Sequence, residues 1–375
     1  MNNIYLDYAA TTPLLPQVKQ HIIELLNEFH NPSSLYQGGV NVKNIITKAR
    51  NNVAKFINGE SDNVTFTSSG SASNTLAIKG YVQKHNCCTL FSPIAHKSIL
   101  KCIESCNNYS HPLTVSSDGT IDVCELDHLL KFLKKEAFVI IDYANSEIGT
   151  VQDVKTIVDT VHKYGGTIMI DCTGSISSIP LDVKSIDADI ITFSGHKLNA
   201  LKGVGVLYKK SNIELEPLVY GSQENGLFAG TENVLGIASL GKSVESYDYN
   251  SISSEGRDYV YNYIINNIKD CYLVGTPLGV RLPHNLYMCF KGVTGESLMT
   301  LMDLNGIQIS TGSACNNYSL TPSATLTAIG MNEEDINSCV RLSFSGNETK
   351  EELDYVCMRL KESVDRLRFL GLIVK

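Results

Sequence analysis

The middle of the chain alternates short apolar runs with amphipathic stretches, and this pattern constrains the fold more than any other feature. The runs are rich in β-branched residues, as expected for strands buried on both faces. They lie at residues 63–67, 88–91, 137–142, 167–170, 189–193 and 203–208. The clearest helix between them is 154–164, where Asp153 is placed to cap the start and Gly165-Gly166 to end it. Strand–helix alternation predicts an α/β protein with a mostly parallel sheet.

The texture of the sequence changes after about residue 250. Helical patterns at 251–268 and 349–368 enclose short strand-like runs near 285–290, 307–310 and 339–344. A chain of 375 residues is too long for one small core, so we expect two domains. The polar, turn-rich segment 245–255 is typical of a linker. We predict a large domain over residues 15–249 and a smaller α+β domain made of residues 1–14 and 250–375.

Composition narrows the range of functions. The net charge of -8 argues against a nucleic-acid-binding surface as the main activity. The N-terminal segment has no basic region followed by an apolar run, and no apolar stretch reaches transmembrane length, so we expect a cytoplasmic protein without a membrane partner. Eleven scattered cysteines include no C-x-x-C pair and join no histidine at metal-ligand spacing, so we expect no metal site.

Polar residues with chemical potential follow the predicted strands. Ser68-Ser69-Gly70-Ser71 precedes a helix expected from about residue 73, and such a turn can hold an anion with backbone N–H groups. The other strands are followed by His96, Asn145, Asp171 and Lys197. Each alone has an ordinary structural explanation, as a helix cap, a structural histidine or a surface lysine. Because ligands sit beyond the carboxyl ends of parallel strands, the set together predicts a pyridoxal 5'-phosphate (PLP) site.

Nine motifs in order resemble one known family along nearly the whole chain. They are YLDYAATTP (5–13), NPSSLYQGG (31–39), FTSSGSASN (66–74), AHKSIL (95–100), NSEIGTVQ (145–152), SGHK (194–197), QENGLFAGTEN (223–233), STGSACNNYSLTPS (310–323) and VRLSFS (340–345). The chain resembles the cysteine desulfurases of the NifS/IscS type, within the PLP-dependent class V aminotransferases. The resemblance implies an aspartate-aminotransferase-like (type I PLP transferase) fold and a homodimer.

The resemblance also assigns roles by position. Lys197 is implied to hold the cofactor as a Schiff base, Asp171 to pair with its ring nitrogen, and His96 to stack on the ring and act in proton transfer. The residues implied to hold the rest of the cofactor are Gly70, Ser71, Ser194, His196, Asn145 and, from a neighbouring subunit, Thr231. Arg341 is implied to bind the substrate carboxylate, aided by Asn145, since a guanidinium fits a carboxylate through two hydrogen bonds.

Cys315 stands where the family has its catalytic cysteine. Residues 310–320 are small and polar, which indicates a surface loop, and Thr321-Pro322 is typical of a helix start that Gly330 would end. A thiolate on such a loop can attack sulfur in the active site and carry the persulfide outward.

Several positions depart from the family pattern. Gly174 stands where a glutamine usually bonds the cofactor's phenolic oxygen. The other departures are Ala72 for glutamate, Tyr8 for asparagine, Tyr36 for histidine, Asn225 and Phe228 for two arginines, and Ala200-Leu201 for Gly-Pro. These positions support the catalytic residues, so their loss can alter activity without abolishing the fold.

Three functions stay open at this point. The first is an active cysteine desulfurase that converts L-cysteine to L-alanine and passes the sulfur to Cys315, for delivery to an acceptor such as an iron–sulfur scaffold or a thiolation enzyme. The second is a related enzyme for another substrate, such as a selenocysteine lyase. The third is a weakly active or non-enzymatic sulfur-trafficking protein.

Overall fold

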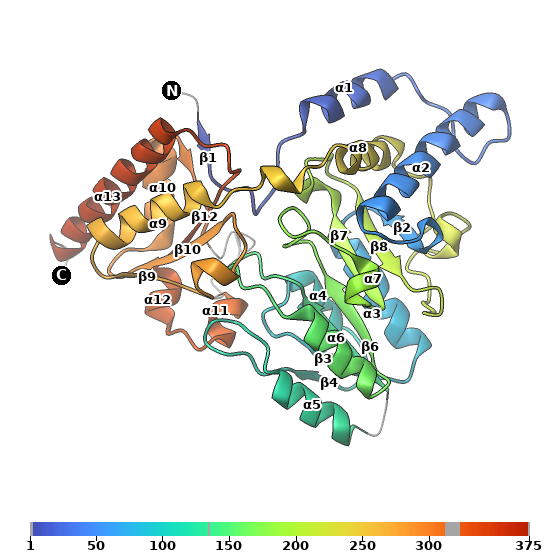
Figure 1. The fold of residues 1–375 in the computed structure, drawn as a ribbon, viewed down its shortest axis with the longest axis horizontal. Coiled ribbons are helices and arrows are strands. Elements are labelled where there is room, and N and C mark those ends of the chain that lie inside the picture. Colours follow the sequence, from blue (N-terminus) through green and yellow to red (C-terminus); the bar gives the residue numbers. More distant parts are fainter. Residues whose placement is uncertain (1–2, 134–135, 312–322, 374–375) are drawn as a thin grey trace.

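A seven-stranded sheet forms the centre of the computed structural model, which describes residues 3–133, 136–311 and 323–373 (Figure 1). Its strand order is β2 (Val64–Thr67), β8 (Gly205–Lys209), β7 (Ile190–Ser194), β6 (Thr167–Asp171), β5 (Ala137–Asp142), β3 (Cys88–Phe91) and β4 (Ser110–Pro112). Strands from β7 to β4 pair in parallel, and only β8 runs against its two neighbours. The structure therefore confirms the predicted α/β class with a mostly parallel sheet.

Helices cover both faces of this sheet (Figure 1). One face packs against α3 (Gly70–Lys84) and α4 (Lys97–Glu104). The other packs against α2 (Gln37–Phe56), α5 (Val123–Phe132), α6 (Val154–Lys163), α7 (Val183–Ile186) and α8 (Val234–Glu245). Helix α1 (Pro16–Leu25) lies outside, against α8.

A second, smaller sheet lies at the other end of the molecule (Figure 1). Its antiparallel strands have the order β12 (Cys339–Ser343), β10 (Asn285–Phe290) and β9 (Cys271–Leu273), and they pack against α9 (Glu255–Asn267), α10 (Gly295–Leu304) and α13 (Lys350–Ile373). The N-terminal β1 (Ile4–Tyr5) pairs with β11 (Ile307–Gln308), and α11 (Ala324–Ala328) and α12 (Glu333–Asn337) complete this region. The exact boundary between domains at residues 249 and 250 stays a prediction.

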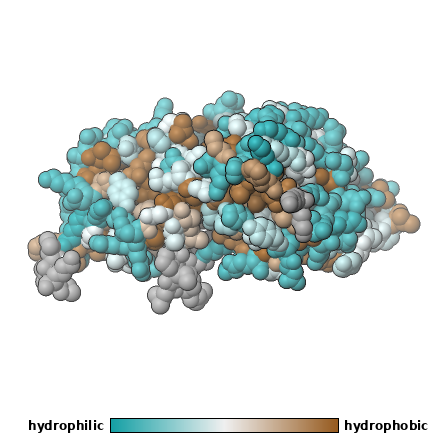
Figure 2. Space-filling view, turned by 90° about the horizontal axis from the view of Figure 1, so that it is seen from below, coloured by the Kyte–Doolittle hydropathy of each residue, from teal (hydrophilic) through white to brown (hydrophobic). Residues whose placement is uncertain are grey.

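The surface is mainly polar on the face that Figure 2 displays, with smaller hydrophobic areas between the hydrophilic residues. Within the described ranges, no helix is both long enough and apolar enough to cross a bilayer.

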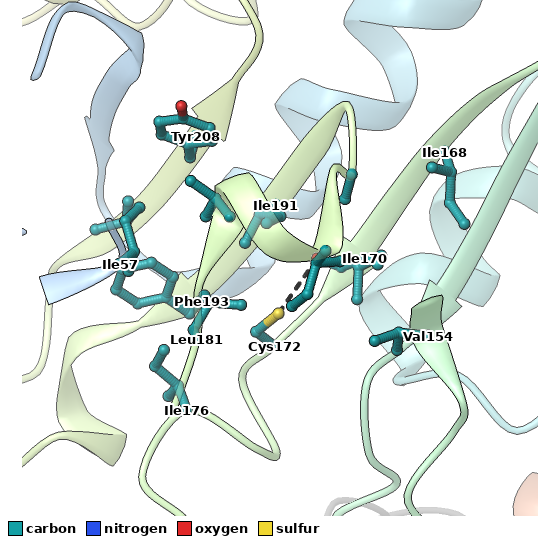
Figure 3. Close-up of a cluster of buried hydrophobic side chains, with 14 of the residues drawn as sticks. Ile57, Val154, Ile168, Ile170, Cys172, Ile176, Leu181, Ile191, Phe193 and Tyr208 are labelled. Atoms are coloured by element: carbon teal, nitrogen blue, oxygen red, sulfur yellow. Dashed lines mark hydrogen bonds between the residues drawn. The ribbon is translucent and has the colours of Figure 1, made fainter. Parts of the chain in front are cut away.

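Alternating side chains of the central strands build two separate cores. Ile168, Ile170 and Ile191 point to the α6 side, where they meet Phe193 and Cys172 in the cluster shown in Figure 3. The intervening residues of the same strands point to the α3 side. Burial on both faces explains why these strands are continuous apolar runs in the sequence.

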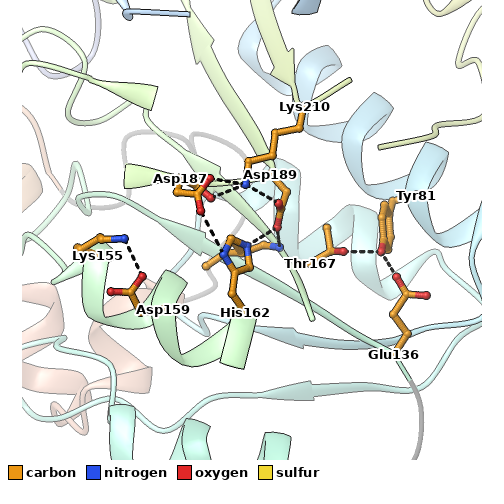
Figure 4. A network of polar contacts seen from close by, with 10 residues as sticks. Tyr81, Glu136, Lys155, Asp159, His162, Thr167, Asp187, Asp189 and Lys210 are labelled. Atoms are coloured by element: carbon orange, nitrogen blue, oxygen red, sulfur yellow. Dashed lines mark hydrogen bonds and ion pairs between the residues drawn. The ribbon is translucent and has the colours of Figure 1, made fainter. Parts of the chain in front are cut away.

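An ionic network closes the sheet edge at which β6 begins (Figure 4). The buried Asp189 carboxylate accepts the Ile168 backbone N–H at 2.9 Å, contacts His162 Nε2 at 2.9 Å and pairs with Lys210 at 3.1 Å. Beside it, the Tyr81 hydroxyl donates to the Thr167 hydroxyl at 2.7 Å. This polar network lies at the opposite end of β6 from Asp171.

The starts of two helices can be compared with the sequence prediction. Helix α3 begins at Gly70 and not near residue 73, because the Ser69 side chain caps it by accepting the Ala72 N–H at 3.1 Å. Helix α11 begins at Ala324 with Ser323 as its cap, while the expected start at Thr321-Pro322 lies outside the described residues.

Candidate active site

The carboxyl ends of β2, β3, β5, β6 and β7 lie at one edge of the central sheet, because these strands share one direction. The predicted site residues Gly70, His96, Asn145, Asp171 and Lys197 stand at or just beyond these ends. Parallel topology therefore assembles residues that are up to about 130 positions apart in sequence, as expected for ligand sites in such sheets.

Lys197 ends a short 3-10 helix, Gly195–Lys197, directly after β7. Its Nζ donates to the carbonyl oxygens of Ala9 and Ala10, the latter at 2.9 Å. The preceding residue, His196, accepts the Thr12 N–H at 3.1 Å through its carbonyl. The segment after β1 thus holds the predicted cofactor lysine against the sheet edge.

Asp171, the last residue of β6, is buried and receives two hydrogen bonds. Its Oδ2 accepts from Asn74 Nδ2 at 2.8 Å, and its Oδ1 accepts from the Thr173 N–H at 2.8 Å. Asn74 in turn accepts from the Thr192 hydroxyl at 2.5 Å. Such donors stabilise an ionised carboxylate, which is the form needed opposite a protonated ring nitrogen.

The start of α3 packs closely against the end of β7. A Cβ atom on Gly70 would stand 3.1 Å from the Ser194 Cβ and 3.3 Å from the Thr173 Oγ1, so this close approach favours glycine. The buried Thr173 Oγ1 has no hydrogen-bond partner within the described part of the chain. Free N–H groups at the start of a 15-residue helix and an unpaired hydroxyl suit a phosphate group.

Two residues of this arrangement were missed by the sequence analysis. Asn74 lies on the buried side of α3, and its signal was a polar residue two positions before the apolar Leu76, Ala77 and Ile78. Thr173 follows Asp171 by two positions and gave no signal beyond that proximity. Both add polar groups around Asp171 and Gly70, and the set fits a phosphorylated cofactor with a basic ring nitrogen.

His96 caps the start of α4. Its Nδ1 lies 2.8 Å from the Ser98 hydroxyl and accepts the Ser98 N–H at 3.2 Å. Ser98 also accepts from Asn74 at 3.0 Å, so a chain of polar contacts joins His96 to Asp171. This chain fixes the orientation of the His96 ring.

His196 has a different environment. Burial, together with the charges of Lys197 and Lys202, lowers its pKa to about 4. Its Nδ1 stands 3.1 Å from the Thr11 hydroxyl. A neutral imidazole can contribute a hydrogen bond to a phosphate but not a charge.

Asn145 is held by its own turn. Its Nδ2 donates to the Ile94 carbonyl at 2.7 Å, and its Oδ1 accepts the N–H groups of Glu147 and Ile148 at 2.9 Å each. A direct contact with substrate or cofactor therefore requires exchange of one of these bonds. In this structure the side chain stabilises the turn after β5.

Arg341 lies on β12, at the junction of the two sheets. Its Nη2 pairs with the Asp7 carboxylate at 2.8 Å, and its Nη1 donates to the Ser146 carbonyl at 3.1 Å. Its backbone exchanges hydrogen bonds with Ser310, at the start of the segment that leads to Cys315. Asp7 was another missed partner, although it belongs to the first motif of the chain.

The remaining predicted residues differ in their exposure to solvent. Ser194 is buried at the end of β7, Ser71 is exposed in the first turn of α3, and Thr231 is exposed before α8. Cys315 lies within 312–322, outside the described residues.

The structure describes the surroundings of two positions that depart from the family pattern, Gly174 and Asn225. A Cβ on Gly174 would stand 2.5 Å from the Ala144 carbonyl oxygen, so the local backbone excludes the usual glutamine. Asn225 adopts a left-handed conformation with φ of 56°, beside Glu224. Glu224 pairs with Arg50 at 2.6 Å and accepts the Phe66 N–H at 2.8 Å, which anchors the 223–233 segment to β2.

Known proteins resemble the chain over nearly its full length. Residues 4–356 match the family described as Aminotransferase class-V. A cysteine desulfurase IscS of Dictyoglomus turgidum is 36% identical over 98% of this chain and 96% of its own. Among solved structures, a NifS-like protein has a TM-score of 0.89 at 26% identity and covers 97% of this chain and 100% of its own. A structure described as SspA in complex with cysteine has a TM-score of 0.80 at 28% identity, with 92% and 100% covered.

Proposed function

The chain belongs to the class V aminotransferase family, and from this premise we propose that it is a cysteine desulfurase of the NifS/IscS type. It converts L-cysteine to L-alanine and transfers the sulfur to Cys315. The observation that supports the proposal most directly is the assembly of Lys197, Asp171 and the start of α3 at one edge of the sheet. The fold agrees with the predicted aspartate-aminotransferase-like architecture.

The cofactor of the family is PLP, and the residues present fit it. When bound, PLP supplies a conjugated, electron-withdrawing ring that weakens bonds at the α-carbon of an amino acid. Lys197 would hold its aldehyde carbon, and Asp171 would keep its ring nitrogen protonated. The start of α3, Ser194 and Thr173 would hold its phosphate.

The substrate carboxylate binds Arg341. The guanidinium lies between Asp7 and the Ser146 carbonyl, and its Nε has no partner among the described residues. It can therefore offer a free N–H to an incoming carboxylate while Asp7 keeps the group in place. Lys197 then accepts the α-proton of the substrate as a general base.

Sulfur transfer involves Cys315. Its thiolate attacks the sulfur of the substrate, a new S–S bond forms, and the C–S bond breaks with its electron pair left on carbon. Protonation of that carbon yields alanine, and Cys315 is left as a persulfide. No external oxidant or reductant is needed, because the substrate's sulfur is oxidised while its carbon is reduced. A sulfur-acceptor protein, either an iron–sulfur scaffold or a thiolation enzyme, then takes the persulfide sulfur.

The proposal is tested by incubating the PLP-loaded protein with L-cysteine and quantifying alanine together with persulfide on Cys315 by mass spectrometry. We expect one alanine for each sulfur released to a thiol acceptor. Cys315→Ser abolishes sulfide release, whereas Cys124→Ser, at an exposed cysteine on α5, leaves it unchanged. Alanine formation from selenocysteine but not from cysteine would instead support the lyase alternative.

We further propose a homodimer in which Thr231 reaches the neighbouring subunit's cofactor site. Its exposure is compatible with this role. Exposed apolar side chains at the end of α1 and in the connection to α2 support an interface there, with Phe29 85% and Leu35 96% exposed. A cytoplasmic location also remains a prediction.

A further inference from the structure

A second carboxyl group lies beside Asp171 at the same edge of the sheet. Asp142 is the last residue of β5, and its Cα is the register partner of Asp171 on β6. Both side chains point to the α3 side, because they alternate with Ile141 and Ile170, which belong to the opposite core. Asp142 is only 6% exposed.

The two carboxyl groups have very different hydrogen-bond environments. Asp171 accepts from Asn74 and from the Thr173 N–H. Asp142 Oδ1 forms no close hydrogen bond within the described ranges, although the hydroxyl of the neighbouring Ser92 acts to lower its pKa. Two buried carboxyl groups on adjacent strands do not both ionise readily, so Asp142, which has the weaker hydrogen bonds, keeps its proton more readily.

The ionisation of Asp142 falls near neutrality. Burial is the main cause, and the charge of Asp171 adds to it, so that the pKa rises from the ordinary 3.8 to about 7. His96, at the start of α4, acts in the opposite direction. Asp171 and His96 are thus charged groups that act on Asp142, while α3 presents the uncharged Asn74 to Asp171, and Thr192 of β7 donates to Asn74.

We propose that Asp142 is a positioning residue that keeps its proton beside Asp171, so that this edge of the sheet carries one negative charge and not two. The inference deepens the proposed function and rests on it only for its catalytic consequence. When Asp142 loses its proton, a second negative charge arises one strand away from Asp171. That charge would favour a protonated ring nitrogen on the bound cofactor.

The raised pKa of Asp142 also determines how the free energy of unfolding depends on pH. A carboxyl group that is harder to ionise in the folded than in the unfolded protein leaves stability intact below pH 4. Stability is then lost as pH rises towards 7, and the loss is complete above that value. Replacing Asp142 by asparagine removes this loss. The variant is therefore expected to be less stable or equal at pH 4 and to gain relative to wild type as pH rises to 8.

The experiment compares wild type, Asp142→Asn and, as a control, Asp159→Asn at an exposed position on α6. Unfolding temperatures of the cofactor-free proteins are measured from pH 4 to 8, and the visible absorption of the PLP-loaded proteins is titrated over the same range. Relative to Asp142→Asn, we expect the unfolding temperatures of wild type and of Asp159→Asn to fall between pH 4 and 7 and to level off above pH 7. We also expect the pH dependence of the visible absorption to differ between Asp142→Asn and the other two proteins. Parallel profiles for all three proteins would overturn the proposal.

A second measurement serves if Asp142→Asn does not fold. Infrared spectra of the cofactor-free protein should contain a protonated-carboxyl band that disappears as pH rises through about 7, and the band should persist in Glu147→Gln, because burial raises the pKa of Glu147 too. A fully ionised set of carboxyl groups at pH 5.5 would contradict the proposal. Both cofactor-free measurements are independent of cysteine turnover, so failure of the proposed desulfurase activity is distinguishable from failure of the role of Asp142.

Discussion

At the scale of single residues, one substitution tests the proposed cofactor-binding and proton-accepting roles of the Lys197 amine without changing the fold. Its Nζ donates to the carbonyl oxygens of Ala9 and Ala10, while its backbone ends the turn after β7. Lys197→Ala should therefore leave far-ultraviolet circular dichroism unchanged, abolish the visible absorption of lysine-bound PLP and reduce alanine formation by about 10²–10⁴-fold. Ultraviolet–visible spectroscopy after PLP addition checks this, and an unaltered spectrum would refute the assignment of Lys197.

The second prediction at the scale of single residues concerns Gly174. A side chain at this position would meet the Ala144 carbonyl oxygen at 2.5 Å, which is backbone and cannot rotate away. Gly174→Gln, which restores the usual family residue, should therefore destabilise the protein by about 1–3 kcal/mol and not improve turnover. Urea unfolding measures the loss. Gly279→Ala is the matched control, because no atom lies within 4 Å of its added Cβ.

At the scale of elements, the Asp189 network fastens the ends of β6, β7 and α6 (Figure 4). Asp189→Ala removes the acceptor of the Ile168 N–H and one of the two carboxylates that pair with Lys210 and His162, while Asp187 remains as the other. We expect a loss of about 1–3 kcal/mol in the free energy of unfolding, mainly because the Ile168 N–H is left buried without an acceptor. Lys155→Ala, which breaks the exposed pair with Asp159, should cost less than about 0.5 kcal/mol. Similar losses for both variants would contradict the importance of burial here.

The elements also show how far sequence patterns reach. The central strands were predictable because burial on both faces makes them apolar throughout, and the prediction for α6 succeeded because Asp153 caps it by accepting the Thr156 N–H. The short edge strand β4, with the sequence Ser-His-Pro, has no apolar pattern and was missed. The predicted site residues lie directly after strands, as the topology requires, while their roles stay predictions. Asn74, Thr173 and Asp142 were not found, since their importance arises from neighbours on other elements.

At the scale of the whole molecule, the position of Arg341 shows that both sheets contribute to one site. Its strand belongs to the small sheet, yet its guanidinium contacts Ser146 from the turn after β5 and Asp7 from the segment after β1. The two sheets therefore cannot shift relative to each other without moving the proposed carboxylate ligand. Asp7→Asn should raise the KM for L-cysteine more than it lowers kcat, because the variant loosens Arg341 without removing it. Steady-state alanine assays check this, and an unchanged KM would contradict the role of Asp7.

The proposed dimer gives the last prediction. Phe29 and Leu35 are almost fully exposed at the periphery of the molecule, in the connection between α1 and α2 (Figure 1). Two large apolar side chains that are exposed in one short segment are expected to be covered by a partner subunit in the dimer. Phe29→Glu combined with Leu35→Glu should convert a dimer to a monomer in analytical ultracentrifugation, with unchanged circular dichroism. The monomer should also lose activity, because Thr231 would no longer reach a second site.

Phe132→Glu, at an exposed phenylalanine on α5, is the control and should remain dimeric. A double variant that stays dimeric would place the interface elsewhere, and a monomeric wild type would exclude the dimer.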